Sequence, residues 1–223
     1  WRAPYLDLPA RQVEGLALLA LYVIVLAIAF VQTRKNWRNL SRWAWFVGLC
    51  LVTLLLNNAL AWHYPIARPP VPNRPQEASP LSAPLLGSLP ILIIGGWLGT
   101  GPAIVAGLLG GLMRSLFIHG QLTPTFEVAF YGLFVGYLLR QNYRGRVSAA
   151  LRQPIVAGVL ARLLVWPLTL HGIYIYAPGE PLDALDFTWP LFLSGWLPAL
   201  IEGILAGLMS KPMLVTWPFV MLL

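Results

Sequence analysis

Long apolar runs separated by short polar segments dominate the chain. The run 15–32 carries no charged residue, and the run 43–62 begins and ends with tryptophan. A membrane-spanning helix needs about 20 mostly apolar residues, and tryptophan is enriched where a helix meets the membrane–water interface. The pattern therefore predicts a spanning helix over each of these two runs.

The apolar stretch 85–118 is too long for one straight crossing. As a single helix it would extend about 50 Å at 1.5 Å per residue, against a hydrocarbon core about 30 Å thick. Gly99, Thr100, Gly101 and Pro102 interrupt the stretch. Glycine favours a tight turn, and proline suits the first turn of a following helix. We therefore expect two short crossings, 85–98 and 102–118.

Three more apolar runs, 122–139, 153–170 and 189–210, complete the predicted set of spans. The proline-rich segment from His63 to Pro84 is typical of an extended connector outside the bilayer. We therefore predict an all-α polytopic integral membrane protein. It is a bundle of about seven (six to seven) transmembrane helices, forming one transmembrane domain over residues 1–223.

The basic residues indicate how the bundle is oriented. They gather in two clusters that follow the first and the fifth predicted spans: Arg34, Lys35, Arg38 and Arg42, and Arg140, Arg144, Arg146 and Arg152. With two crossings in the stretch 85–118, both clusters fall on one side, which the positive-inside rule makes cytoplasmic. We expect a multi-pass protein of the cell membrane, with its N-terminus outside and its C-terminus in the cytoplasm.

The composition is that of a membrane protein, and it argues against a soluble domain and against a nucleic-acid-binding protein. Hydrophobic residues make up 58% of the chain and charged residues 10%, against roughly 25% charged in a soluble domain. The net charge of +7 lies in short clusters between apolar runs, so we expect no nucleic-acid partner. The chain opens on Trp1 and closes on Leu223 inside an apolar stretch, and we expect it to be part of a longer protein.

Four ionisable residues fall inside predicted spans: Arg114, Glu127, Arg162 and Glu202. Such residues are costly in a membrane and are functional candidates by default. Position along the spans places Arg114 and Glu127 just beneath the outer surface, about one and a half helical turns deep. Arg162 and Glu202 share a depth near mid-membrane. We therefore predict two ion pairs, Arg114–Glu127 and Arg162–Glu202.

Arg114 is the strongest ligand-binding candidate, because a guanidinium group can hold a carboxylate through two hydrogen bonds. Glu127, Asn57 and Asn58 complete the candidate site. The alternative is structural: the charges neutralise each other and the asparagines bond between helices. Small residues four apart, as in Gly107 and Gly111 or Gly132 and Gly136, predict close helix packing under either reading.

No pattern indicates catalysis, a cofactor or a metal. The chain has no phosphate loop, no zinc motif and no nucleophile with a neighbouring base. Its three histidines, His63, His119 and His171, are widely separated, so interfacial positions are favoured over a metal cluster. Cys50 is the single cysteine, which leaves no disulfide. We expect these residues to form no enzyme and to bind no cofactor.

A glycine-rich run ends in Gly101-Pro102, and Gly107, Gly110 and Gly111 then lead to Arg114. With a later Gly-xxx-Gly span ending at Arg140, the region of about residues 95–140 resembles the LytS-type five-transmembrane sensor domain. That resemblance implies the membrane input of a histidine kinase or diguanylate cyclase. It also implies a small carboxylate ligand that contacts Arg114, and a catalytic output domain elsewhere in the full protein.

Size, basic charge and Gly-xxx-Gly spacing also make the chain similar to substrate-binding subunits of energy-coupling-factor vitamin transporters. A non-catalytic subunit of a larger membrane complex is a third reading. We predict a sensory input domain of a signalling receptor that binds a small, anionic ligand from the outer side. The expected partners are the lipid bilayer, the ligand, and a second copy or other membrane subunits.

Overall fold

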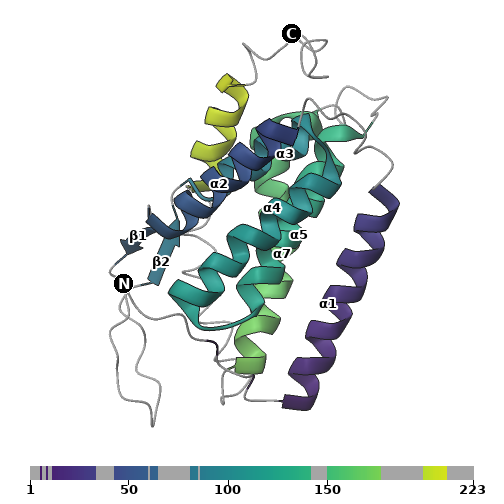
Figure 1. Ribbon diagram of the computed structural model, residues 1–223, viewed down its shortest axis with the longest axis vertical. Helices are drawn as coiled ribbons and strands as arrows, with labels where there is room; N and C mark the ends of the chain where they lie inside the picture. Colours follow the sequence, from purple (N-terminus) through teal and green to yellow (C-terminus); the bar gives the residue numbers. More distant parts are fainter. Residues whose placement is uncertain are drawn as a thin grey trace.

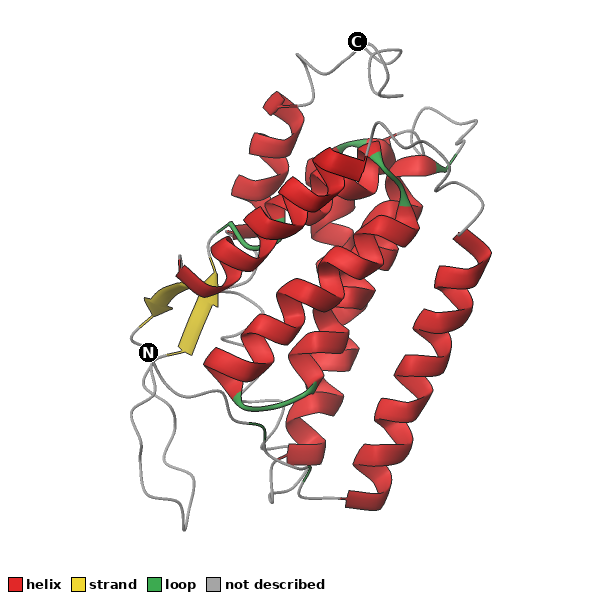
Figure 2. Cartoon of the chain, in the orientation of Figure 1, coloured by secondary structure: helices red, strands yellow, loops and turns green. Residues whose placement is uncertain are grey.

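The computed structural model describes Leu6, Pro9 and residues 12–33, 43–59, 61–64, 81–84, 86–141, 150–176 and 198–209. Within these residues the fold is helical apart from one pair of short strands (Figure 2). The elements in chain order are α1 (Gln12–Thr33), α2 (Trp43–Ala59), β1 (Ala61–Tyr64), β2 (Leu81–Pro84), α3 (Leu89–Trp97), α4 (Thr100–Arg114), the π-helical turn η3 (Ser115–His119), α5 (Thr123–Arg140), the 3₁₀ turn η4 (Ala150–Arg152), α7 (Pro154–Tyr176) and a last helix, Pro198–Met209.

Three helices are long and apolar enough to cross a membrane: α1, α4 with its continuation to Ile118, and α7. They contain 22, 19 and 23 residues. In Figure 1 they lie beside α5 with their axes in broadly the same direction, and α1 stands at one side of the bundle. The helices Trp43–Asn57 and Pro198–Met209 are apolar but shorter.

Helices α4 and α5 lie so close that their backbones touch. A Cβ atom added at Gly111 would lie 2.6 Å from the Thr125 Cα, and one added at Gly136 would lie 2.5 Å from the Thr100 Cα. Gly107 and Gly132 face Val128 and Ala103 just as closely. Residue numbers rise along one helix as they fall along the other, so the pair is antiparallel. The small-xxx-small spacing did predict close helix packing, and that prediction is confirmed.

The turn predicted at Gly99–Pro102 lies between α3 and α4. Gly99 has a φ of 110°, a backbone conformation that residues with a Cβ rarely adopt. Helix α3, however, has only nine residues and is therefore about 13 Å long, which is under half of a hydrocarbon core. The first of the two predicted crossings, 85–98, thus contains a short helix that cannot span a bilayer by itself.

Helix α3 is almost enclosed by the rest of the bundle. Every residue from Pro90 to Gly96 is buried, and the helix packs on α2, α4 and α5. Ser88 precedes its first residue and is only 1% exposed. The polar residue at the start of α3 is therefore buried inside the protein, because α3 itself is enclosed.

The predicted all-α fold class is confirmed, with one local difference. Strands β1 and β2 pair antiparallel, with His63 opposite Ser82 (Figure 2). Both strands adjoin or lie within the segment that we predicted to be an extended connector. The helix over the run 43–62 consequently ends at Ala59, and Ala61 and Trp62 belong to β1. Extended, proline-rich ends suit a strand at the edge of a sheet better than a helix.

The contact between α4 and α5 should be sensitive to a single methyl group. We expect Gly132→Ala to lower the free energy of unfolding by about 1–3 kcal/mol, because the added Cβ meets the Ala103 carbonyl group in a packed interface. Gly48→Ala is the matched control, since a Cβ at Gly48 meets nothing within 4 Å and alanine favours a helix over glycine. Denaturation of the detergent-solubilised variants, followed by tryptophan fluorescence, measures both. Equal stability of the two variants would contradict the packing described.

Candidate functional site

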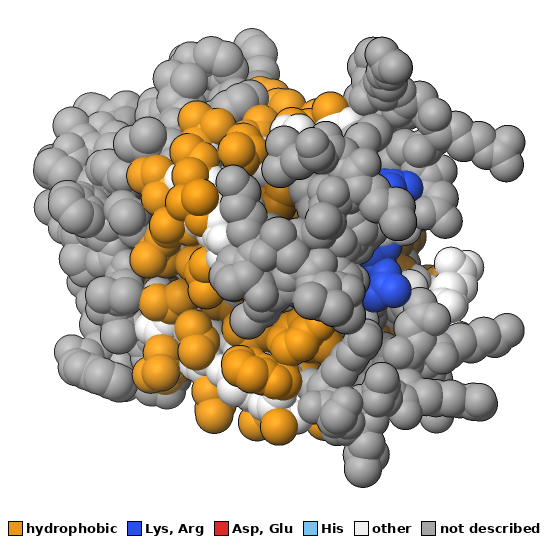
Figure 3. Space-filling model, turned by 90° about the horizontal axis from the view of Figure 1, so that it is seen from above, with side chains coloured by type: hydrophobic (Ala, Val, Ile, Leu, Met, Phe, Trp, Pro, Cys, Tyr) orange, Lys and Arg blue, Asp and Glu red, His pale blue; other side chains and the backbone are white. Residues whose placement is uncertain are grey.

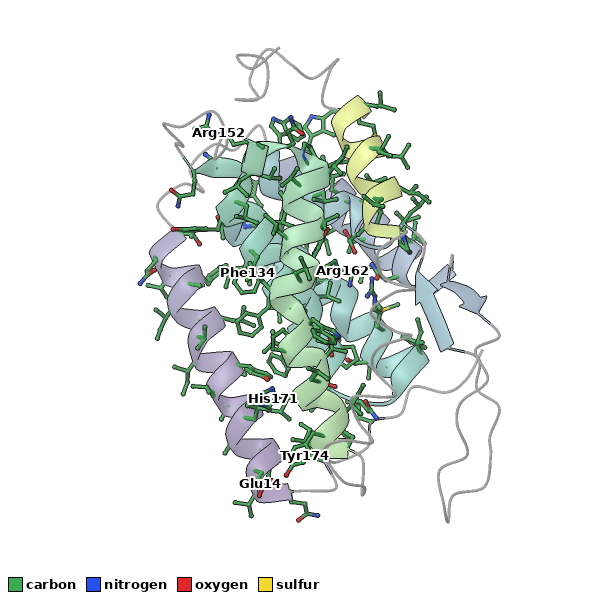
Figure 4. The ribbon with its side chains drawn as sticks, turned by 180° about the vertical axis from the view of Figure 1, so that it is seen from behind. Glu14, Phe134, Arg152, Arg162, His171 and Tyr174 are labelled. Carbon is green, nitrogen blue, oxygen red and sulfur yellow. The ribbon has the colours of Figure 1, made fainter. Side chains whose placement is uncertain are left out.

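Polar side chains from α2, α4, α5, α7 and the helix Pro198–Met209 are linked to one another and to Gly87 and Ser88, at the start of α3. We call this set of residues the Ser88 cluster: Asn57, Gly87, Ser88, Arg114, Tyr131, Arg162 and Glu202. Figure 4 shows Arg162 about midway along α7, on the side away from α1, between Arg152 near one end and Tyr174 near the other. The cluster therefore lies inside the bundle and not at either end.

Asn57 joins α2, α4 and the chain before α3. Its Nδ2 donates to the Gly87 carbonyl oxygen at 3.0 Å and to the Thr53 carbonyl oxygen at 2.7 Å. Its Oδ1 accepts a hydrogen bond from Arg114 Nε at 2.6 Å. Asn57 is fully buried, and three of its four hydrogen-bonding positions are thereby used. This residue fixes the orientation of the Arg114 side chain.

Gly110 makes room for that arrangement. A Cβ at this position would lie 2.8 Å from the Thr53 Cγ2 atom and 3.0 Å from Asn57 Nδ2. Because glycine occupies the position, α2 approaches α4 one turn before Arg114. Immediately after Arg114 the helix widens into the π-helical turn Ser115–His119, where the Ser115 and Thr125 hydroxyl groups lie 2.7 Å apart. Such π-helical turns often occur at functional sites.

Ser88 joins α7 to the last helix. The Ser88 backbone N–H donates to Glu202 Oε1 at 2.9 Å, and Arg162 Nη2 donates to Ser88 Oγ at 2.6 Å. The guanidinium carbon of Arg162 also lies 4.9 Å from the centre of the Tyr131 ring, a cation–π distance. Ser88 thus links a positive and a negative side chain that come from two different helices.

Several polar atoms of the cluster are buried without a hydrogen-bond partner among the described residues. They are Arg114 Nη2, Arg162 Nε, the Tyr131 hydroxyl group and Glu202 Oε2. Arg114 is 8% exposed and Glu202 is 0% exposed. Leaving a buried polar group unpaired costs about 1–3 kcal/mol, and more for a charged group. The cluster therefore presents unused hydrogen-bonding capacity of both kinds, donors on the arginines and an acceptor on the glutamate.

The charged groups are close enough to influence one another. Arg114 interacts electrostatically with Arg162, Glu202 and Glu127, and Glu202 interacts with both arginines. Glu127 lies on the α1 and α7 side of α5, where it forms a side-chain hydrogen bond with Thr169 and interacts with Tyr22. Two positive and two negative side chains thus lie near one another, with Arg114 and Glu202 buried and Arg162 and Glu127 partly buried.

The predicted ion pairs take a different form. Arg162 and Glu202 are joined through Ser88, which accepts from the first and donates to the second. Arg114 and Glu127 are electrostatic neighbours, but the hydrogen bond of Arg114 goes to Asn57 and that of Glu127 to Thr169. Depth along the spans placed these residues near one another, but it could not show which polar group lies between them.

The other residues singled out in the sequence lie apart from the cluster. Asn58 follows Asn57 on α2, and its side chain lies outside the described residues. His63 belongs to β1 and His119 to the π-helical turn, while the exposed His171 lies on α7, with Nδ1 2.8 Å from the Pro167 carbonyl oxygen. Among the described residues, no three His, Cys, Asp or Glu side chains are grouped so that they could hold a metal ion.

Sequence reasoning missed Ser88 and Tyr131. A serine directly before an apolar run with an early proline is a helix-start signal, and it could have placed Ser88 at the beginning of α3. Nothing in the sequence shows that this start is buried against Glu202. Tyr131 looks like one more apolar position of α5, and nothing in the sequence shows that its ring lies against the Arg162 guanidinium group.

Chemically, the Ser88 cluster is suited to binding and orienting a small polar molecule. Its guanidinium groups can donate to a carboxylate, and its glutamate can accept from a hydroxyl or ammonium group. Comparisons with models of known protein families, with curated proteins and with solved structures find no match to this chain. The resemblance to LytS-type sensor domains therefore stays a prediction from the sequence.

The bonds of Asn57 should matter more than those of its neighbour Thr53. We expect Asn57→Leu to lower the free energy of unfolding by about 2–4 kcal/mol, because it leaves Arg114 Nε and the Gly87 carbonyl buried and unpaired. Thr53→Val serves as the control, since the Thr53 hydroxyl group bonds only within α2, to the Leu49 carbonyl oxygen. Chemical denaturation in detergent compares the two. If Asn57→Leu is no less stable than Thr53→Val, the described role of Asn57 is wrong.

Proposed function

We propose that this chain is a membrane-embedded sensory input domain that binds a small anionic ligand at the Ser88 cluster, reached from the outer side. The observation that carries the proposal is the pair of guanidinium groups of Arg114, which is buried, and Arg162, which is partly buried. Each has an enclosed nitrogen atom without a hydrogen-bond partner among the described residues.

The proposed membrane location is supported by large hydrophobic side chains that are exposed on the surface of the helices. Large hydrophobic side chains are exposed along α1, including Ile24 (55%) and Val31 (66%), and along α2. Figure 3 views the molecule from above, along its longest axis; the described side chains seen there are also mostly hydrophobic, with basic side chains at one side of the view. Soluble proteins rarely expose a continuous apolar surface of this kind, whereas lipid tails solvate it.

The ligand part is supported by the energy of the buried charges. An arginine inside a spanning helix is costly, by about 2.5–3.5 kcal/mol at the helix centre on insertion scales. Arg114 and Arg162 each also have an enclosed nitrogen atom that is unpaired among the described residues, and a ligand that bonds to these atoms would remove that further cost. A carboxylate would accept from both guanidinium groups through short, charge-assisted hydrogen bonds.

A ligand bound at the cluster can change helix packing because every anchor belongs to a different helix. Arg114 is held by Asn57 of α2, and Arg162 and Glu202 meet at Ser88. An anion that competes with Asn57 for Arg114 weakens the link between α2 and α4. A ligand shifts such an equilibrium only by its difference in affinity for the two states. The change is then carried to the cytoplasmic ends of these helices.

The proposed orientation can be tested at the two ends of α5. In a Cys50→Ala background, we expect Gln121→Cys to react with a membrane-impermeant maleimide in intact cells. Gln141→Cys should react only after permeabilisation, because it lies beside the basic cluster that the positive-inside rule assigns to the cytoplasm. Equal labelling of both positions in intact cells, or the reverse pattern, contradicts the proposed topology.

The arginine itself is tested by substitution. We expect a small carboxylate, titrated against the detergent-solubilised protein, to raise its melting temperature, since a ligand at 100 times its Kd stabilises by about 2.7 kcal/mol. Arg114→Ala should remain folded and should abolish that shift, because it removes a charged donor from the site. Arg140→Ala, at the exposed end of α5, is the control and should keep it.

Arg114→Lys is a second variant for the case in which Arg114→Ala does not fold. It retains the positive charge but loses the planar, two-pronged set of guanidinium donors. It should bind at least about tenfold more weakly than the unchanged protein. Unchanged binding by Arg114→Ala would show that the ligand site lies elsewhere. Co-isolation of the full protein with a pair of ATPase subunits would instead favour the substrate-binding subunit of a transporter.

A further inference from the structure

The Ser88 cluster contains an unused acceptor as well as unused donors. Glu202 is 0% exposed. Its Oε1 accepts from the Ser88 backbone N–H at 2.9 Å, whereas its Oε2 has no hydrogen-bond partner among the described residues. A ligand that is only an anion can satisfy the guanidinium groups, but it offers nothing to this carboxylate oxygen and repels it.

The unused atoms are arranged around one short chain segment. Gly87 accepts from Asn57, which holds Arg114, and Ser88 contacts both Arg162 and Glu202. Arg162 in turn lies over the ring of Tyr131, whose hydroxyl group also has no hydrogen-bond partner in the part of the chain that the structure describes. Arg162 and Glu202 thus both contact Ser88, and Arg114 is linked to the adjoining Gly87 through Asn57. This arrangement suits a ligand whose own acceptor and donor are separated by only a few bonds.

The balance of charge points the same way. Arg114, Arg162, Glu127 and Glu202 interact electrostatically, and their formal charges cancel when both carboxyl groups are ionised. An anion without a compensating group would then add a net negative charge to this set of residues, and burying an uncompensated charge is costly. A ligand that carries its own hydrogen-bond donor beside the carboxylate limits that cost, and an ammonium group removes the net charge altogether.

We propose that the ligand is a small carboxylic acid with a hydrogen-bond donor on the neighbouring carbon, that is, a hydroxy acid or an amino acid. Its carboxylate accepts from Arg114 Nη2 and Arg162 Nε, and its hydroxyl or ammonium group donates to Glu202 Oε2. This inference rests on the proposed function, and it adds that Glu202 determines which anion the site accepts.

Matched sets of ligands test the donor directly. Each set keeps one carbon skeleton and changes one substituent: acetate, glycolate and glycine; propanoate, lactate and alanine; succinate, malate and aspartate. Binding to the full chain in lipid nanodiscs is measured by calorimetry and by the shift in melting temperature. In at least one set we expect the hydroxy or amino acid to bind about tenfold or more tightly than its unsubstituted partner, the effect of one hydrogen bond to a charged group.

Glu202→Gln identifies the residue responsible. The amide keeps an oxygen acceptor and the bond from Ser88 but loses the charge, so the preference for the substituted acids should fall by about tenfold, most of all for the amino acid. Glu14→Gln, on the first turn of α1, is the matched control and should leave the preference unchanged. Retention of the full preference by Glu202→Gln would contradict the role given to this residue.

The outcomes separate this inference from the proposed function. If unsubstituted acids bind as tightly as their substituted partners, the donor requirement is wrong, while the site for a small anion stands. If no acid in any set binds a protein that melts cooperatively, both are wrong. If Glu202→Gln does not fold, the comparison of ligands with the unchanged protein still decides the donor requirement.

Discussion

Charge buried among apolar helices is the constraint on which the rest of the structure depends. Arg114, Arg162 and Glu202 lie in a bundle whose surface is largely hydrophobic, and each unpaired charge there is costly. Asn57 on α2 forms a hydrogen bond with Arg114, and Ser88, at the start of a short, enclosed helix, forms one with Glu202. Because Asn57 and Ser88 bond to charged groups from different helices, the same contacts that reduce the cost also fix how the helices pack.

Close backbone packing makes that arrangement rigid. Helices α4 and α5 touch through Gly107, Gly111, Gly132 and Gly136, so the position of Arg114 on α4 follows from the position of α5. Gly110 lets α2 approach at the same level. The framework is thus held by contacts that tolerate little change, whereas the Ser88 cluster keeps donors and an acceptor that no described residue pairs with.

The sequence predicted the helices and the charged residues better than their contacts. Apolar length identified α1 and α7, glycine identified the turn at Gly99, and ionisable residues within apolar runs identified Arg114 and Glu202. The spacing and length of the apolar runs cannot show that Ser88 is buried, since it lies in the segment before a helix. They also cannot show that Ser88 joins Arg162 to Glu202. The strand pair was missed because Ala61 and Trp62 continue an apolar run and because prolines obscured the pairing of Leu81–Pro84.

The central claim is that the Ser88 cluster binds a small molecule within the protein. The most direct measurement is the native mass spectrum of the full protein released gently from its own membranes. We expect a peak shifted by the mass of a small acid, lost on collisional activation, and absent from the spectrum of Arg114→Ala. Detection of the same adduct on Arg114→Ala, or of only the unshifted mass for the unchanged protein, would contradict the account.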